Sequence, residues 1–163
     1  MPRRFSGEGQ LAITRDGTGP RHFTGDSRRQ CGRVEHRDDV ADDIAATVKV
    51  VKPSVAVPPW PDQWDTLVSQ ATVAVTGFGG CGSCSTRSMR DALDLEAAGI
   101  PAVCIVHRAL VPAVEALCRL VGAPGYPFVV VDYPYNPTGV WSEDEASAMA
   151  EQVLDAVRAR LTA

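Results

Sequence analysis

Short apolar runs that do not alternate with polar residues place the strongest limit on the fold of this chain. Three of them, at 72–76, 101–107 and 126–133, are separated by segments with helical patterns. Strands of this kind are buried on both faces, so they require a parallel sheet with helices on each side. With a further strand expected at 46–54, the sequence predicts a doubly wound, Rossmann- or flavodoxin-like α/β domain with a parallel sheet of about four strands.

Helical patterns occupy residues 60–70, 86–98, 110–122 and 142–161. In the second of these, Ser88 and Asp91 have the spacing of a capping box, which marks the start of a helix. The last begins with Ser142 and a run of acidic residues, as a helix N-terminus prefers. Ligand sites in doubly wound sheets lie beyond the carboxyl ends of the strands. The loops expected to meet there are 77–85, 107–110 and 132–141.

Residues 1–45 differ from the rest of the chain in composition. They are rich in Gly, Arg and Asp and contain few large apolar residues, so they offer little burial to offset the entropy of ordering. We expect an extended or disordered arm with at most a short strand at 10–14, followed by an α/β domain at 46–163. Cys31 and His36 lie in this arm, but two candidate ligands alone are weak evidence for a metal.

The overall composition limits the class of partner. The chain has 163 residues, of which 45% are apolar, and its formal net charge is −4. Such a chain fits one globular domain and offers no basic surface for nucleic acid or an anionic membrane. No apolar run approaches the ~18 residues of a membrane span, and the first residues lack the apolar core of a secretory signal. We therefore expect a cytoplasmic protein without a nucleic-acid or membrane partner.

The five cysteines fall into different contexts. A structural disulfide framework is not expected in a reducing compartment. Cys104 and Cys118 lie in apolar segments, where cysteine acts as a small hydrophobic residue. Cys81 and Cys84 instead lie among glycines and serines in the stretch GFGGCGSC at 77–84, where packing does not require them.

Three interpretations of this stretch compete. Gly77, Gly79 and Gly82 spell GxGxxG between a strand and a helix, but the dinucleotide fingerprint also needs an acidic residue about 20 positions later. The segment CIVHRAL at 104–110 contains none. A metal would find at most three ligands, from the two cysteines and a histidine, without a second CxxC. A CxxC pair at a helix N-terminus is instead typical of a reactive thiol with a lowered pKa. No cofactor is expected, while dinucleotide binding and a purely structural turn stay open as alternatives.

The segment GCGSCSTRSMRDALDLEAAGIPAVCI at 80–105 resembles the core of the UGSC family, which comprises selenoproteins and their cysteine homologues. The family signature is Sec/Cys-Gly-Ser-Cys, followed by a helix of the type hDAxxLExxGIP. The resemblance extends from about Val51 to the C-terminus and includes VKPS at 51–54 and LVGAPGYPFVVV at 120–131. It implies that Cys81 stands where some relatives carry selenocysteine and that Cys84 is its partner.

The family in turn is distantly similar to the selenoprotein B component of glycine, sarcosine and betaine reductases. That component cleaves a C–N bond reductively through a covalent seleno-adduct.

Two features depart from the family pattern. Residues 1–45 do not resemble the usual N-terminal strand–helix unit, which leaves either an incomplete sheet or a partner subunit that supplies the missing half. Tyr133-Pro134 stands where relatives often carry His-Pro.

These observations assign a role to each candidate residue. Cys81 is expected to be the nucleophile and Cys84 the resolving thiol, with His107 as an acid–base residue near them. The residues expected to bind substrate are Gly79, Gly80, Gly82, Ser83, Ser85, Arg87, Tyr133 and Asn136. N–H groups at the helix start and Arg87 would hold an anionic group of the substrate, and Tyr133 and Asn136 would line the pocket.

The resulting functional hypothesis is a thiol-dependent redox enzyme or enzyme subunit. It would carry out reductive cleavage, or thiol or sulfur transfer, on a small molecule, with an external thiol as the reductant. A non-catalytic or partial subunit of a hetero-oligomeric enzyme is one alternative, and a dinucleotide-binding protein is another.

Overall fold

A computed structural model describes residues 10–14, 46–77, 80–132 and 142–162. The strands are β1 (Gln10–Thr14), β2 (Ala46–Val50), β3 (Val73–Gly77), β4 (Ala102–His107) and β5 (Val129–Val131). The helices are α2 (Pro61–Gln70), α3 (Gly82–Ala97), α4 (Val111–Leu120) and α5 (Glu143–Leu161), with a 3-10 turn, η2 (Arg108–Leu110), before α4. Among the described residues, no helix is long and apolar enough to cross a membrane.

The sheet is mixed, with the strand order β2-β1-β3-β4-β5. Strands β3, β4 and β5 are parallel, whereas β1 pairs antiparallel with both β2 and β3. A fourth parallel strand next to these three is therefore not present in the described sheet. The strand expected at 46–54 forms as β2, but β1 lies between it and β3. The prediction of parallel strands covered by helices is correct for β3, β4 and β5 only.

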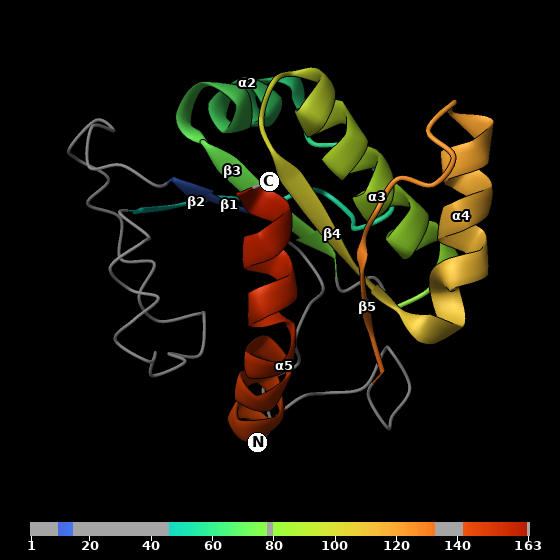
Figure 1. Ribbon diagram of the computed structural model, residues 1–163. Coiled ribbons are helices and arrows are strands. Elements are labelled where there is room, and N and C mark those ends of the chain that lie inside the picture. The colour runs from blue at the N-terminus through green and yellow to red at the C-terminus, as the bar shows by residue number, and fades with distance from the viewer. Residues whose placement is uncertain (1–9, 15–45, 78–79, 133–141, 163) are drawn as a thin grey trace.

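Helices cover both faces of the sheet, as Figure 1 shows: α5 lies on one face, and α2, α3 and α4 lie on the other. The residues of β4 alternate between the two layers. Val103 and Ile105 pack with Met149 of α5, whereas Cys104 and Val106 belong to the cluster under α3 and α4. Because both faces of β4 are buried, its sequence shows no alternation of polar and apolar residues.

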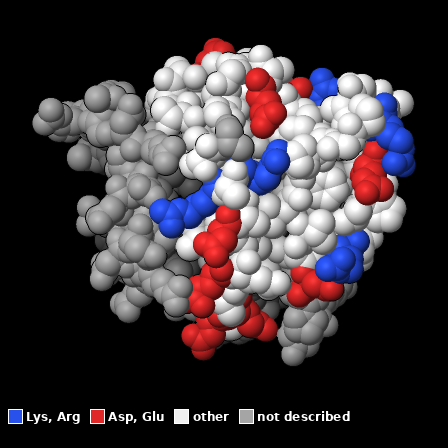
Figure 2. Space-filling view, in the orientation of Figure 1, with Lys and Arg blue, Asp and Glu red and all other residues white. Residues whose placement is uncertain are grey.

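The start of α5 agrees with the sequence, and the start of α3 does not. Ser142 Oγ accepts the Glu145 N–H at 3.2 Å, and the Glu145 carboxylate accepts the Ser142 N–H at 2.7 Å, which is a complete capping box. Acidic side chains gather along α5 on the face shown in Figure 2. Helix α3 begins at Gly82 and is capped by Cys81, so the capping box predicted at Ser88 is wrong.

Ser88 and Asp91 lie inside α3 and bind other elements. Thr76 of β3 donates its hydroxyl to the Ser88 carbonyl at 2.9 Å. The carboxylate of Asp91 is fully buried and receives Lys52 Nζ at 2.7 Å and Arg87 Nε at 2.8 Å. Lys52 is itself 4% exposed. A buried charge is costly unless it is paired, so this ion pair ties the segment after β2 to the middle of α3.

Asp91→Asn should lower the free energy of unfolding by about 3 kcal/mol, because it leaves Lys52 buried without its counter-charge. Asp94→Asn is the matched control on the same helix. Asp94 is 33% exposed where it pairs with Arg87 and Arg90, so its loss should cost at most about 1 kcal/mol. Urea unfolding of both variants measures the difference. Equal losses would show that the buried pair does not hold α3 in place.

Candidate active site: the thiol pair at the start of α3

The loop that carries the thiols follows the carboxyl end of β3. Gly77 ends this strand with φ +148°, a conformation that favours glycine. A Cβ atom at this position would lie 2.5 Å from the Ile105 carbonyl oxygen. Glycine therefore allows β3 to end in close contact with β4, and α3 begins five residues later at Gly82. The predicted site residue Gly79 lies outside the described residues.

Cys81 is the N-cap residue of α3. Its backbone is extended, with φ −149° and ψ 171°, and its sulfur accepts the Cys84 N–H at 3.4 Å. The Cys81 carbonyl accepts the Ser85 N–H at 3.0 Å. Serine, threonine, aspartate or asparagine usually occupies this position, because an oxygen accepts from the unpaired N–H groups of the first turn. Here a sulfur takes that place, at the positive end of the helix dipole.

The two thiols of the CxxC sequence face each other. Cys81 Sγ lies 2.7 Å from Cys84 Sγ and 3.2 Å from Ser83 Oγ. All four cysteines within the described residues are free thiols, so no disulfide joins Cys81 to Cys84 in this structure. Cys81 is exposed to solvent and Cys84 is half-buried. The site therefore holds a reduced dithiol with one accessible sulfur.

The pKa values of the two thiols move in opposite directions. The hydrogen bond from the Cys84 side chain, followed by those from the Ser83 hydroxyl and the Cys84 N–H, lowers the pKa of Cys81 from 9.0 to about 7. Burial, followed by the hydrogen bond to Cys81 and the charge on it, raises the pKa of Cys84. The shared proton therefore resides on Cys84. Near neutral pH, a large fraction of Cys81 is thiolate, the form of cysteine that reacts.

Two of the N–H groups at the start of α3 are used by Cys81 itself. The Cys84 N–H binds the Cys81 sulfur and the Ser85 N–H binds the Cys81 carbonyl. These two N–H groups therefore hold Cys81 in position. Ser85 is 2% exposed, so it is not accessible to a substrate in solution. Gly80 and Gly82 flank Cys81, and a Cβ on Gly82 would lie 3.9 Å from Ala113 Cβ. The first turn of α4 therefore lies beside the thiol loop.

Arg87 does not direct its charge at the thiols. Its guanidinium donates to Asp91 at 2.8 Å and to Asp94 at 3.1 Å, and its side chain is 17% exposed. The lowered pKa of Cys81 has its causes in Cys84 and Ser83. Two carboxylates thus partly neutralise Arg87, and its contact with a substrate anion stays a prediction.

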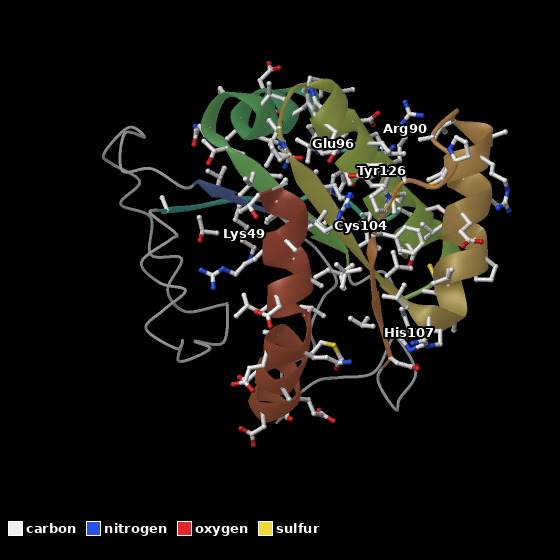
Figure 3. The ribbon with its side chains drawn as sticks, viewed as in Figure 1. Lys49, Arg90, Glu96, Cys104, His107 and Tyr126 are labelled. Atoms are coloured by element: carbon white, nitrogen blue, oxygen red, sulfur yellow. The ribbon has the colours of Figure 1, made fainter. Side chains whose placement is uncertain are left out.

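His107 ends β4 at the same carboxyl edge of the sheet as the thiol loop. Figure 3 shows it near the start of α4. Its Nδ1 accepts the Ala109 N–H at 3.1 Å, so the neutral imidazole carries its proton on Nε2. This contact caps η2 and orients the ring. The acid–base role of His107 stays a prediction, and the predicted pocket residues Tyr133 and Asn136 lie outside the described residues.

The sequence pattern indicates no role for Lys52 and predicts Asp91 as part of a cap. Both residues belong to the segments that carry the family resemblance, VKPS and the helix after CxxC. The lysine of VKPS and the aspartate of the helix were therefore the sequence features that could have indicated this ion pair. Their separation of 39 residues hides the contact from any local pattern.

The family model of the UGSC family matches residues 35–163. The chain belongs to the UGSC family. No curated protein and no solved structure matches this chain. The matched region contains every described site residue, including the thiol pair, His107 and the Lys52–Asp91 pair. The further likeness of this UGSC protein to the selenoprotein B component is not shown by these comparisons and stays a prediction.

Ser83→Ala should raise the pKa of Cys81, because it removes one of the hydrogen bonds that stabilise the thiolate. Alkylation of Cys81 at neutral pH should slow by about three-fold, measured as the rate of iodoacetamide labelling of the Cys81 peptide by mass spectrometry. Ser69→Ala is the control, since its hydroxyl binds the Asp65 carbonyl in α2. An unchanged rate of Cys81 alkylation in Ser83→Ala would show that Ser83 does not stabilise the Cys81 thiolate.

Proposed function

We propose that this UGSC protein is a thiol-dependent oxidoreductase in which Cys81 is the nucleophile and Cys84 the resolving thiol. The observation that carries the proposal is the contact of 2.7 Å between two free thiols whose pKa values move apart. A nucleophile and a second thiol within reach of it are the two parts that reductive cleavage by thiols needs. Membership of the UGSC family is compatible with this chemistry.

The reaction proceeds in two steps. The Cys81 thiolate attacks one atom of a polarised or disulfide bond X–Y, forms a Cys81–X bond, and expels Y with the bonding electron pair. The Cys84 thiol then loses its proton and attacks the Cys81 sulfur, which forms the Cys81–Cys84 disulfide and releases X with its electron pair. X and Y each take up a proton. The substrate thereby gains two electrons and two protons, and the dithiol is oxidised.

An external thiol closes the cycle by thiol–disulfide exchange, in which two thiols become a disulfide and the Cys81–Cys84 pair is reduced. His107 is the residue that we expect to deliver a proton to the leaving group, because it ends β4 at the same edge of the sheet. A small molecule is the substrate class that fits, since the exposed Cys81 sulfur lies at a helix start flanked by glycines.

The roles of the two cysteines follow from their surroundings. Cys81 is exposed, caps the helix and has the lowered pKa, so it is the thiol that meets a substrate first. Cys84 is half-buried in the first turn and has a raised pKa. Burial, and after it the hydrogen bond to Cys81 and the charge on Cys81, raise the pKa of Cys84 and keep it protonated, and an adduct on Cys81 removes that charge. The order of attack is therefore fixed by the local electrostatics.

Cys84→Ser should trap the first intermediate. With 4,4′-dithiodipyridine as the probe, the wild-type pair should release two equivalents of thiopyridone and end as an internal disulfide. Cys84→Ser should release one equivalent from this site and keep a thiopyridyl adduct on the Cys81 peptide, because the resolving thiol is gone. Cys81→Ser should react slowly at this site, since the pKa of Cys84 is raised.

Peptide mapping by mass spectrometry assigns each product to its cysteine. An adduct that accumulates on Cys84 in the wild type would reverse the two roles. Two unreactive thiols would contradict the proposal and leave the alternative of a non-catalytic subunit.

A further inference from the structure

An exposed ion pair joins the ends of two strands at the carboxyl edge of the sheet. Arg108 directly follows β4 and Asp132 directly follows β5, and Arg108 Nε lies 2.7 Å from Asp132 Oδ2. Because β3, β4 and β5 are parallel, their carboxyl ends lie at the same edge. The ion pair therefore shares this edge with the thiol loop after β3, and the reaction described above gives it no role.

The backbone of Arg108 is fixed close to the thiol loop. Arg108 begins η2, and its carbonyl accepts the Val111 N–H where this turn passes into α4. One residue of the first turn of α4, Ala113, lies beside Gly82, the neighbour of Cys81. Adjacent strands are about 4.8 Å apart. A molecule bound to the Cys81 sulfur that extends across the end of β4 therefore meets the Arg108 side chain.

Arg108 is more accessible than the two cations buried around α3. Its side chain is 66% exposed, whereas that of Arg87 is 17% exposed between two carboxylates and that of Lys52 is 3% exposed against Asp91. The first turns of α3 and α4 contain no acidic residue, so no carboxylate of these turns repels an anion at this edge. Arg108 is thus the better placed of these three cations to bind an anion from solution.

The contact with Asp132 does not prevent Arg108 from binding another anion. The Asp132 side chain is 58% exposed, and ion pairs between side chains as exposed as these contribute little to stability. A second oxyanion can therefore replace Asp132 at small cost. The planar guanidinium can hold such an oxyanion with two parallel N–H donors. By contrast, Arg87 pairs with Asp91, whose carboxylate is fully buried and not displaced by solutes.

We propose that Arg108 determines the substrate specificity of the thiol pair by binding an oxyanion of the substrate. Asp132 holds the guanidinium until the substrate replaces it. This inference rests on the proposed function, since the substrate is the molecule that Cys81 attacks. The substrate class is a small molecule whose oxyanion lies about 5 to 10 Å from the attacked atom, which is one to two strand spacings. Arg108 then makes the anion contact that the sequence predicts for Arg87.

Two disulfide probes of different charge separate this role from thiol reactivity itself. 5,5′-Dithiobis(2-nitrobenzoate) carries two carboxylates, whereas 4,4′-dithiodipyridine is neutral, and both form a mixed disulfide with a thiolate. The rate of modification of the Cys81 peptide by each probe is measured near neutral pH by mass spectrometry of quenched samples. The ratio of the anionic to the neutral rate reports the effect of probe charge, because the nucleophile is the same in both reactions.

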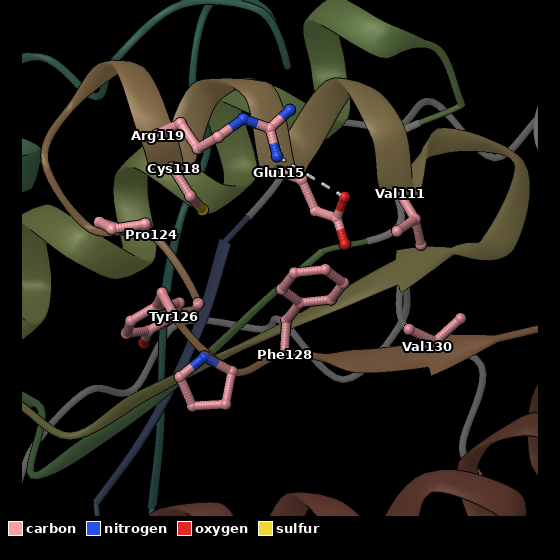
Figure 4. Close-up of a pocket in the computed structure, with 10 residues that line it drawn as sticks. Val111, Glu115, Cys118, Arg119, Pro124, Tyr126, Phe128 and Val130 are labelled. Carbon is pink, nitrogen blue, oxygen red and sulfur yellow. Dashed lines mark ion pairs between the residues drawn. The ribbon is translucent and has the colours of Figure 1, made fainter.

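Arg108→Gln should lower this ratio by about three-fold, because it removes the charge that attracts the carboxylate. Arg119→Gln is the matched control. It removes the same charge from a side chain that is 63% exposed, in the last turn of α4 and so at the far end of this helix from η2. Figure 4 shows Arg119 paired with Glu115. The control should keep the wild-type ratio.

Asp132→Asn should raise the same ratio by about three-fold, because the guanidinium loses the carboxylate that competes with the probe. Glu115→Gln is its control, with a side chain that is 53% exposed, and should keep the wild-type ratio. An ion pair that only joined the two strand ends would change the ratio in the same direction in both variants, or in neither.

The proposal is overturned if Arg108→Gln lowers the ratio no more than Arg119→Gln does, or if Asp132→Asn fails to raise it above the ratio of Glu115→Gln. In either case both probes still modify Cys81, so the thiol chemistry stands and only the role of Arg108 is lost. If neither probe modifies Cys81 in the wild type, the proposed function fails, and the role of Arg108 fails with it.

Discussion

The hydrogen bond from the Cys84 N–H to the Cys81 sulfur determines the geometry of the site. It ends the glycine loop, starts α3, and fixes the nucleophilic atom at the positive end of that helix. The same turn brings the Cys84 thiol within 2.7 Å of this sulfur. The helix cap and the redox pair are therefore one structural unit, so a change that unwinds the first turn of α3 would also separate the thiols.

The rest of α3 keeps this turn in place. Its third turn is held by the buried carboxylate of Asp91, which binds Lys52 and Arg87. Thr76 of β3 binds the Ser88 carbonyl, and Gly77 ends β3 against β4. The two segments that carry the family resemblance in the sequence, VKPS and the helix after CxxC, thus meet in one buried ion pair.

The sequence predicted the features that depend on local patterns. The structure contains the strands expected at 72–76 and 101–107 and the helix cap at Ser142. These features were predictable because a strand buried on both faces and a helix cap each depend on residues that are close together in the sequence. The position of β1 between β2 and β3 was not predictable, since strand pairing joins distant segments. Strand β5 is shorter than expected, and Pro127 lacks the N–H that a longer ladder needs. The start of α3 was placed late because Gly82, Ser83 and Ser85 are poor helix formers.

The chemistry of the site depends on Cys81 being the thiolate of the pair near neutral pH. The direct measurement is the rate of iodoacetamide labelling of the Cys81 peptide in the folded protein, followed from about pH 5 to about pH 10. The labelling rate of Cys81 should rise with a midpoint near its pKa of about 7, while Cys84 is labelled only at higher pH. A midpoint for Cys81 at the ordinary value of 9.0, or a lower midpoint for Cys84 than for Cys81, would contradict it.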